Sequence, residues 1–154
     1  MEPLARRPVR VLPEGPRIVY KLLTLAEWQA ATVAMVFSGS GIDLSDGFIH
    51  LSSAAQVAET LARHFALVGQ PLMVLAVDLG RVDGEVRWEA SRHGALFPHV
   101  YGTIPVAAVV AAEPLRRDRD GGHILPDLPT SLLASRESPL ADTSSADLSS
   151  ADGR

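Results

Sequence analysis

The first half of the chain alternates between strand-like and helical apolar patterns. The run RIVYKLL predicts a short strand over Ile18–Leu22. Thr24 and Glu27 then match T-x-x-E, a capping box that predicts a helix over residues 25–36. The segment FSGSGIDLSDG is rich in Gly, Ser and Asp and predicts a loop. FIHLS, which follows it, predicts a second short strand.

The second half of the chain is dominated by strand-like runs. Ser53 and Gln56 form a second capping box, S-x-x-Q, which predicts a helix that begins at Ser53. PLMVLAVDL is almost continuously apolar and predicts a buried central strand. Asp83-Gly84 predicts a turn, followed by a short strand over Arg87–Glu89. HVYGTIP predicts a short strand or turn, and VAAVVAAEPL predicts a last apolar strand.

These elements follow the order β-α-β-α-β-β-β-β. Early helices followed by a run of strands are typical of an α+β fold with mainly antiparallel pairing. We therefore expect a single domain over residues 18–128, with two helices that cover one face of the sheet. Residues 1–17 are rich in Pro and Arg and predict an extended arm. Residues 129–154 are dominated by Ser, Ala and Asp and predict a disordered tail.

Composition narrows the class of protein. Apolar residues make up 47% of the chain, which is enough for a core, and the net charge is −4. A negative chain is not expected to bind nucleic acid generically, because neutralising phosphates needs a basic face. No apolar run approaches the ~20 residues of a membrane-spanning helix, so no membrane partner is expected. The N-terminal residues lack a secretory signal, and the expected location is the cytoplasm.

Six residues with chemically useful side chains fall on predicted strand edges and loops: Lys21, His50, Ser52, Glu89, His99 and Tyr101. Because side chains alternate along a strand, Phe48, His50 and Ser52 should share one face, with Ile49 and Leu51 in the core. The same alternation places His99 and Tyr101 on one face of FPHVYG. We expect these residues to converge on one site.

Each of the six residues also has a structural explanation. A backbone group could satisfy His50, and Ser52 or Ser53 could simply cap the next helix. Lys21 could be a solvated residue on an edge strand, and Glu89 an exposed carboxylate. FPHVYG could form an ordinary surface hairpin. These alternatives stay open from the sequence.

Three kinds of site could use these residues. His50, His99 and Glu89 are ligand types that suit zinc or iron, but no H-x-x-x-H or H-x-H spacing supports a metal, so none is expected. A serine hydrolase would need a G-x-S-x-G elbow around Ser52, which the chain lacks. The third kind, a nucleotide pocket, agrees with more of the residues.

The nucleotide hypothesis gives each residue a role. The free N–H groups of a helix beginning at Ser53 would favour an anion. His50 and Ser52 would bind ribose hydroxyls, His99 would add a hydrogen bond, and Tyr101 would stack on a ring. Lys21 would meet a phosphate. Glu89 would stabilise an oxocarbenium-like centre, as carboxylates do in glycoside chemistry.

A resemblance supports this hypothesis. IVYKLLTLAEW, DGFIHLSSAAQV, PLMVLAVDL, VRWEA and FPHVYGTIP together closely resemble the bacterial domain-of-unknown-function family 952, over about residues 18–115. That family is similar to the ADP-ribosyltransferase fold, and its nearest functional analogues are the NAD-dependent tRNA 2′-phosphotransferases. The resemblance implies NAD as a ligand, with Tyr20-Lys21, His50-Leu51-Ser52 and Ile104-Pro105 matching segments of those enzymes.

One departure from the resembled enzymes sets up an alternative function. Lys21 stands where the tRNA enzymes carry histidine. The residues that would hold an RNA phosphate in those enzymes have no clear match in this chain. The first hypothesis is therefore an NAD- or nucleotide-binding protein that acts at the nicotinamide glycosidic bond. The alternative is a catalytically inactive ligand-binding or protein-interaction domain of the same fold.

Overall fold

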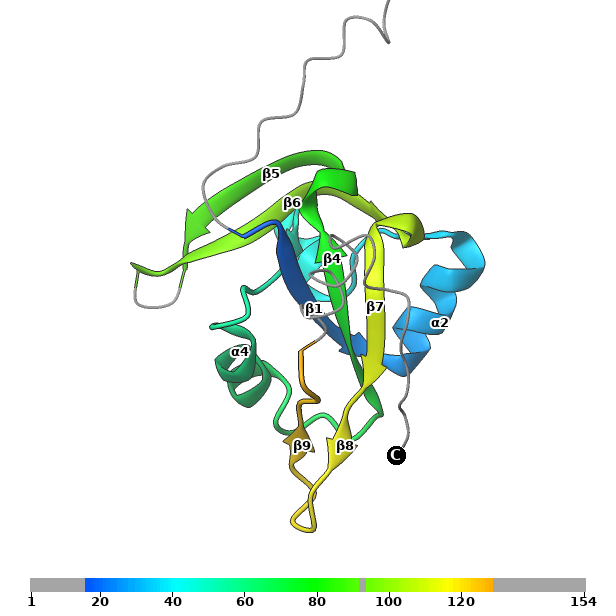
Figure 1. Ribbon diagram of the computed structural model, residues 1–154, viewed down its shortest axis with the longest axis vertical. Coiled ribbons are helices and arrows are strands. Elements are labelled where there is room, and N and C mark those ends of the chain that lie inside the picture. Colours follow the sequence, from blue (N-terminus) through cyan, green and yellow to red (C-terminus); the bar gives the residue numbers. More distant parts are fainter. Residues whose placement is uncertain (1–15, 92–93, 129–154) are drawn as a thin grey trace, which may run out of the picture.

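A three-stranded antiparallel sheet forms the centre of the molecule (Figure 1). The computed structural model describes residues 16–91 and 94–128, so the predicted tail and most of the predicted arm lie outside the described residues. The sheet has the order β1 (Ile18–Thr24), β4 (Leu72–Asp78) and β7 (Val109–Pro114). Every residue of β4 is buried. The apolar run PLMVLAVDL thus forms the central strand, as predicted.

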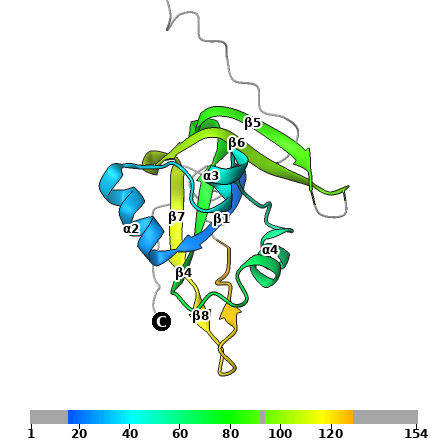
Figure 2. The same ribbon diagram turned by 180° about the vertical axis from the view of Figure 1, so that it is seen from behind.

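The helices α2 (Leu25–Ala34) and α4 (Val57–His64) pack on opposite faces of this sheet. Alternate residues of β1 divide between two core clusters. Val19 and Leu23 pack with Ala31 of α2, whereas Tyr20 packs with Leu61 of α4. In both views the two helices lie to opposite sides of β1 (Figures 1 and 2). The expectation that both helices cover one face is therefore wrong.

A second sheet is built around the long strand β6 (Leu96–Pro105). β6 pairs with β5 (Asp83–Ala90), β3 (Ile49–His50) and β2 (Val36–Phe37), always antiparallel. The predicted turn at Asp83-Gly84 is wrong, since both residues lie in β5. Gly84 opposes Gly102 in β6, and a Cβ on Gly102 would lie 2.0 Å from the carbonyl oxygen of Asp83. Two facing glycines thus let the strands approach where a turn was expected.

Several of the predicted boundaries differ from the structure, and the helix predicted over residues 25–36 ends at Ala34 because Val36–Phe37 form β2. The capping box at Thr24 is confirmed, since its hydroxyl accepts from the Glu27 N–H and the Glu27 carboxylate accepts from the Thr24 N–H. At Ser53, however, only turns follow, and α4 begins at Val57. The predicted loop before β3 instead contains a helix of five residues, α3 (Ile42–Asp46). The described residues therefore include three α-helices rather than two.

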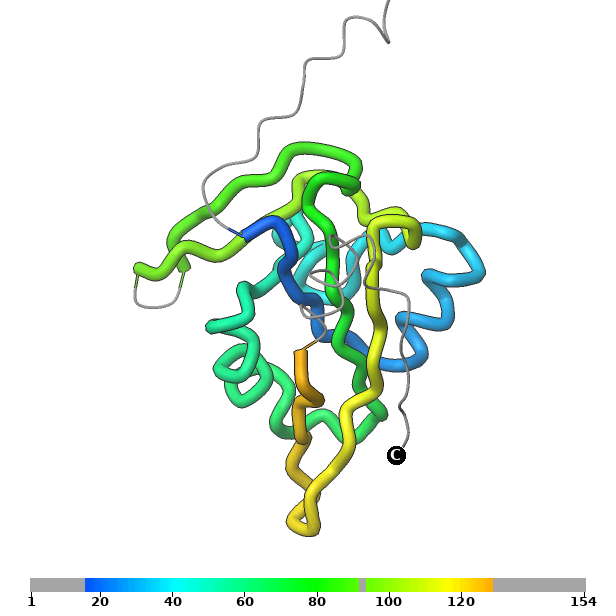
Figure 3. Tube along the Cα trace, in the orientation of Figure 1, coloured from blue at the N-terminus to red at the C-terminus, as the bar shows by residue number. Residues whose placement is uncertain are grey.

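Short elements complete a single α+β domain. The 3-10 helices η1 (Leu79–Arg81) and η3 (Val106–Ala108) flank the sheets, and β8 (Arg116–Arg117) pairs with β9 (His123–Ile124). This last hairpin and the β5–β6 hairpin lie at opposite ends of the molecule (Figure 3). Within the described residues, no helix is both long and apolar enough to cross a membrane.

Candidate functional site

A cavity of about 600 Å³ lies beside β1. β1 is an edge strand, and on the side away from β4 Tyr20 exchanges two backbone hydrogen bonds with Ser52. The residues around this edge come from β1, α2, the α3 segment, β3, α4 and β6, and from Ser91 just after β5. The lining includes Lys21, Glu27, Ser40, Asp43, Asp46, His50, Ser52, Thr60, His64, Phe65, Ser91, Phe97 and His99.

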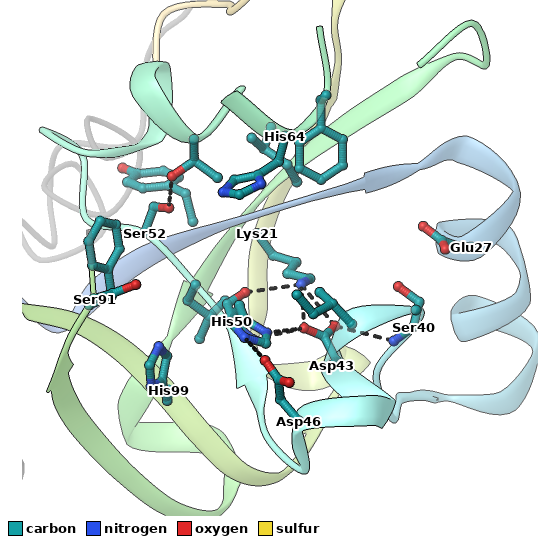
Figure 4. A pocket seen from close by; sticks show the side chains of 18 of the residues that line it. Lys21, Glu27, Ser40, Asp43, Asp46, His50, Ser52, His64, Ser91 and His99 are labelled. Atoms are coloured by element: carbon teal, nitrogen blue, oxygen red, sulfur yellow. Dashed lines mark hydrogen bonds and ion pairs between the residues drawn. The ribbon is translucent and has the colours of Figure 1, made fainter. Parts of the chain in front are cut away.

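Lys21 sits in the floor of this cavity in a buried ion pair (Figure 4). Its Nζ donates to both carboxylate oxygens of Asp43, at 2.9 and 3.2 Å, and to the carbonyl oxygen of His50 at 3.0 Å. Burial lowers the pKa of Lys21, and the charge of Asp43 opposes that shift. The sequence-based view of Lys21 as a solvated edge residue is wrong, because this ammonium group is buried and has three acceptors.

Asp43 organises the segment around His50. Its Oδ1 accepts from the backbone N–H of His50 at 3.0 Å and lies 2.7 Å from His50 Nδ1, while Oδ2 accepts from the Ser40 N–H at 3.2 Å. Burial alone would raise the pKa of Asp43, but the hydrogen bond from His50 and the charge of Lys21 lower it to about 2. Asp43 is therefore ionised at neutral pH and links β1 to β3.

His50 and His99 are direct neighbours across the β3–β6 ladder. Their ring centroids are 5.4 Å apart, and the ring of Phe48 stacks on His99 at 4.2 Å and contacts His50 at 4.6 Å. On its outer side, His50 Nε2 lies 3.0 Å from Asp46 Oδ2. Both nitrogens of His50 thus face a carboxylate, and strand register alone brings the two imidazoles together.

A second carboxylate–histidine pair lies behind His99. Glu89 Oε1 is 2.7 Å from His99 Nδ1, and the Tyr101 hydroxyl donates to the same oxygen at 2.7 Å. These hydrogen bonds, from His99 first and then Tyr101, lower the pKa of Glu89. The same bond to Glu89 raises the pKa of Tyr101. The guanidinium carbon of Arg87 lies 4.2 Å from the centre of the Tyr101 ring and occupies one face of it.

Ser52 is held by its backbone and its hydroxyl. Its Oγ lies 2.8 Å from the Thr60 hydroxyl of α4, and the residue is buried. The expected helix N-terminus at Ser53 is not present. The N–H groups of Gln56 and Val57 both donate to the carbonyl of Ser53 in a turn before α4. The predicted anion site assumed a helix that begins at Ser53, whereas α4 begins four residues later at Val57. The Ser53 N–H itself donates to the Gln56 side chain at 3.0 Å, as the predicted capping box requires.

Four of the six predicted site residues, Lys21, His50, Ser52 and His99, line the cavity. Glu89 and Tyr101 are not among the lining residues but reach it through His99. The sequence analysis expected all six residues to converge on one site, and the structure brings four of them to the cavity directly.

Sequence reasoning missed Asp43 and Asp46, the carboxylates that hold His50. Ser40 and Asp43 match S-x-x-D, a helix-start signature that could have revealed α3. Among the described residues, no group of three or more His, Asp or Glu side chains is arranged to hold a metal ion.

The fold and the site define an α+β protein with a cavity, next to its two larger antiparallel sheets, that is lined by two histidines bound to carboxylates. The chain belongs to the family described as "Protein of unknown function (DUF952)", whose model matches residues 22–112. The family assignment made from the sequence motifs is thus confirmed.

Solved structures of one relative are similar over most of the described residues. The crystal structure of protein CC0527 from Caulobacter crescentus is 42% identical, with a TM-score of 0.64, and the match covers 76% of this chain and 98% of that one. The solution NMR structure of CC0527 is 41% identical, with a TM-score of 0.60, and the match covers 77% and 99% of the two chains. No curated protein matches this chain.

Proposed function

We propose that this chain is an ADP-ribosyltransferase-like protein that binds NAD or a related nucleotide in the cavity beside β1. The observation that carries the proposal is the convergence of Lys21, His50, Ser52 and His99, from three separate strand segments, on one cavity of about 600 Å³. Cavities of roughly 300–1,000 Å³ are typical of small-molecule sites. The resemblance of the motifs to NAD-dependent enzymes supplies the ligand class.

The lining has the mixed character that a nucleotide needs. Phe65 and Phe97 offer apolar surface to a base or nicotinamide ring. Ser52 and His99 offer polar atoms to ribose hydroxyls, and His50 lines the same cavity with its two ring nitrogens bound to Asp43 and Asp46. Lys21 is already bound to Asp43, so a phosphate would compete with that carboxylate for the ammonium group. We therefore place the ribose, rather than the phosphates, nearest to Lys21 and His50.

Calorimetric titration of the full chain with NAD and with ADP-ribose tests this proposal. Wild type should bind at least one of the two ligands. His50→Ala should weaken binding about tenfold or more, a loss of about 1.4 kcal/mol, because it removes the ring that Asp43 and Asp46 hold at the cavity. His123→Ala is the matched control, because His123 lies on β9 outside this cavity. A folded wild type that binds neither ligand would refute the proposal.

A catalytically inactive binding domain is the second candidate. The fixed position of Lys21 favours it, since the resembled enzymes carry histidine there and this lysine is bound to Asp43 and the carbonyl of His50. The location of Glu89 also favours it, because its carboxylate is bound to His99 and Tyr101. Chromatographic measurement of nicotinamide separates the two. Binding of NAD without nicotinamide release supports the second candidate, and release supports an enzyme.

A further inference from the structure

His99 is a buried imidazole that lines the cavity and has one of its two ring nitrogens bound to a carboxylate. Its side chain is only 7% exposed, yet it lines the cavity. Nδ1 lies 2.7 Å from Glu89 Oε1. Within residues 16–91 and 94–128, Nε2 makes no hydrogen bond to another residue. Buried polar atoms normally have a hydrogen-bond partner, so we infer that a bound ligand supplies the partner of this nitrogen.

The neighbours of His99 determine where its proton lies. Hydrogen bonds from His99 and Tyr101 lower the pKa of Glu89, so its carboxylate is ionised and can only accept. Nδ1 must therefore carry the proton and donate it. Burial lowers the pKa of His99, and although Glu89 opposes the shift, His50 reinforces it. The neutral imidazole then presents an unprotonated Nε2.

Packing holds this imidazole in place. Phe48 stacks on the ring at 4.2 Å with an interplanar angle of 28°. The titratable and charged groups around His99 are Glu89 of β5, Asp46 of α3, His50 of β3 and Tyr101 of β6, with Arg87 of β5 against Tyr101. A base with a fixed ring and a fixed proton position is pre-organised for one kind of partner.

We propose that His99 Nε2 accepts a hydrogen bond from a hydroxyl of the bound ligand, and that Glu89 is the positioning residue that fixes the required tautomer. The ligand at this end of the cavity is a hydroxyl donor such as a ribosyl group. A phosphate is disfavoured there, because its ionised oxygens and the Nε2 lone pair are both acceptors. This inference rests on the proposed function for the identity of the ligand.

The tautomer is measured first, without any ligand. Long-range ¹H–¹⁵N NMR of the full chain reports which imidazole nitrogens carry protons. Wild type should show His99 protonated at Nδ1 and bare at Nε2 at neutral pH. In Glu89→Gln the amide can donate to Nδ1, so a population protonated at Nε2 should appear. Glu85→Gln is the matched control, since Glu85 is on the same strand but pairs with Arg87. A wild-type His99 protonated at Nε2 would overturn the inference whether or not a ligand binds.

Calorimetry with ADP-ribose as a function of pH then tests the ligand contact. Binding requires neutral His99, so affinity should fall about tenfold per pH unit below the pKa of His99. Because Glu89 raises that pKa, the midpoint should move to lower pH in Glu89→Gln and stay unchanged in Glu85→Gln. NMR titration assigns the midpoint to His99 rather than His50.

The two proposals fail in different ways. ADP-ribose affinity that is constant through the titration of His99 would overturn the hydroxyl contact while leaving nucleotide binding intact. Absence of both NAD and ADP-ribose binding would overturn the proposed function, and the ribosyl assignment with it. In that case the NMR spectrum still decides, independently, whether Glu89 fixes the tautomer of His99.

Discussion

Replacing Lys21 by methionine tests whether the buried ion pair holds the site together. In the wild type, the side chains of Lys21 and Asp43 are 9% and 1% exposed. Nζ donates to both oxygens of Asp43 and to the carbonyl of His50. Methionine keeps the apolar stem but removes all three donors. The carboxylate of Asp43 would then stay buried without the adjacent ammonium charge.

The expected loss of stability follows from that geometry. Removing one partner of a buried pair costs roughly 3–5 kcal/mol, mostly because the remaining charge is uncompensated. Asp43 keeps its hydrogen bonds from Ser40 and His50, so we expect the lower end, about 3 kcal/mol. For a domain of this size that corresponds to a fall in Tm of roughly 12 °C or more. Adding Asp43→Asn removes the charge and should recover about 1 kcal/mol.

Urea unfolding followed by tryptophan fluorescence measures this cost, since Trp28 and Trp88 pack against the core. Arg63→Met is the control, because the Arg63–Glu59 pair is about half exposed on both sides. Exposed pairs contribute roughly 0–1 kcal/mol. If Lys21→Met costs no more than Arg63→Met, the view of this pair as a structural centre of the site is refuted.

Three further predictions concern stability. The pKa of Asp43 is about 2 in the folded protein and 3.8 for an ordinary Asp, so its ionised form contributes about 2 kcal/mol to the free energy of unfolding above pH ~4. This contribution is lost as the pH falls towards 2, and urea unfolding as a function of pH should show that acid limb, the loss of stability at low pH, in the wild type but not in Asp43→Asn. Gly102→Ala places Cβ 2.0 Å from a carbonyl oxygen of Asp83 and should cost about 2 kcal/mol or more in the same assay, whereas Gly69→Ala meets no atom within 4 Å and should be nearly neutral. Met35 has φ 68° at the end of α2, so thermal unfolding should show that Met35→Gly stabilises by up to ~1 kcal/mol.

Each of these has a clear opposite outcome. An acid limb in Asp43→Asn equal to that of wild type would show that another carboxyl group causes it. A Gly102→Ala protein as stable as Gly69→Ala would mean that β5 and β6 separate at little cost. A loss of stability in Met35→Gly would show that the Met35 side chain stabilises the protein by more than its left-handed backbone costs.

The start of α2 was predicted correctly, because its sequence signal lies within a few neighbouring residues. Thr24 and Glu27 satisfy each other's backbone groups within one turn, so the helix start is fixed locally. Asp83-Gly84 shows the opposite case. The composition of this pair is that of a turn, but its residues pair with Thr103 and Gly102, and only the pairing of β5 with β6 places them in a strand. Cross-strand pairing involves residues far apart in sequence, which a local pattern does not report.

In the candidate site too, local sequence patterns predicted some features and cross-strand pairing decided others. Alternation along FIHLS correctly placed Ile49 and Leu51 in the core and His50 on the face with Phe48. Neither alternation nor motif spacing connects His50 with His99, because strand register sets that contact. The solvated alternative for Lys21 is wrong, because an edge strand of a sheet need not be exposed and this residue is buried.

By itself, the sequence determined the family, the α+β class and the central strand, and it named six candidate site residues, of which the structure places four in the lining of the cavity. The tertiary structure decided which of their charges are paired. Lys21 and Asp43 are 22 positions apart, and only the folding of α3 against β1 buries them together. Burial makes an unpaired charge costly, so the ion pair, the orientation of His50 and the tautomer of His99 all depend on packing that no single segment contains.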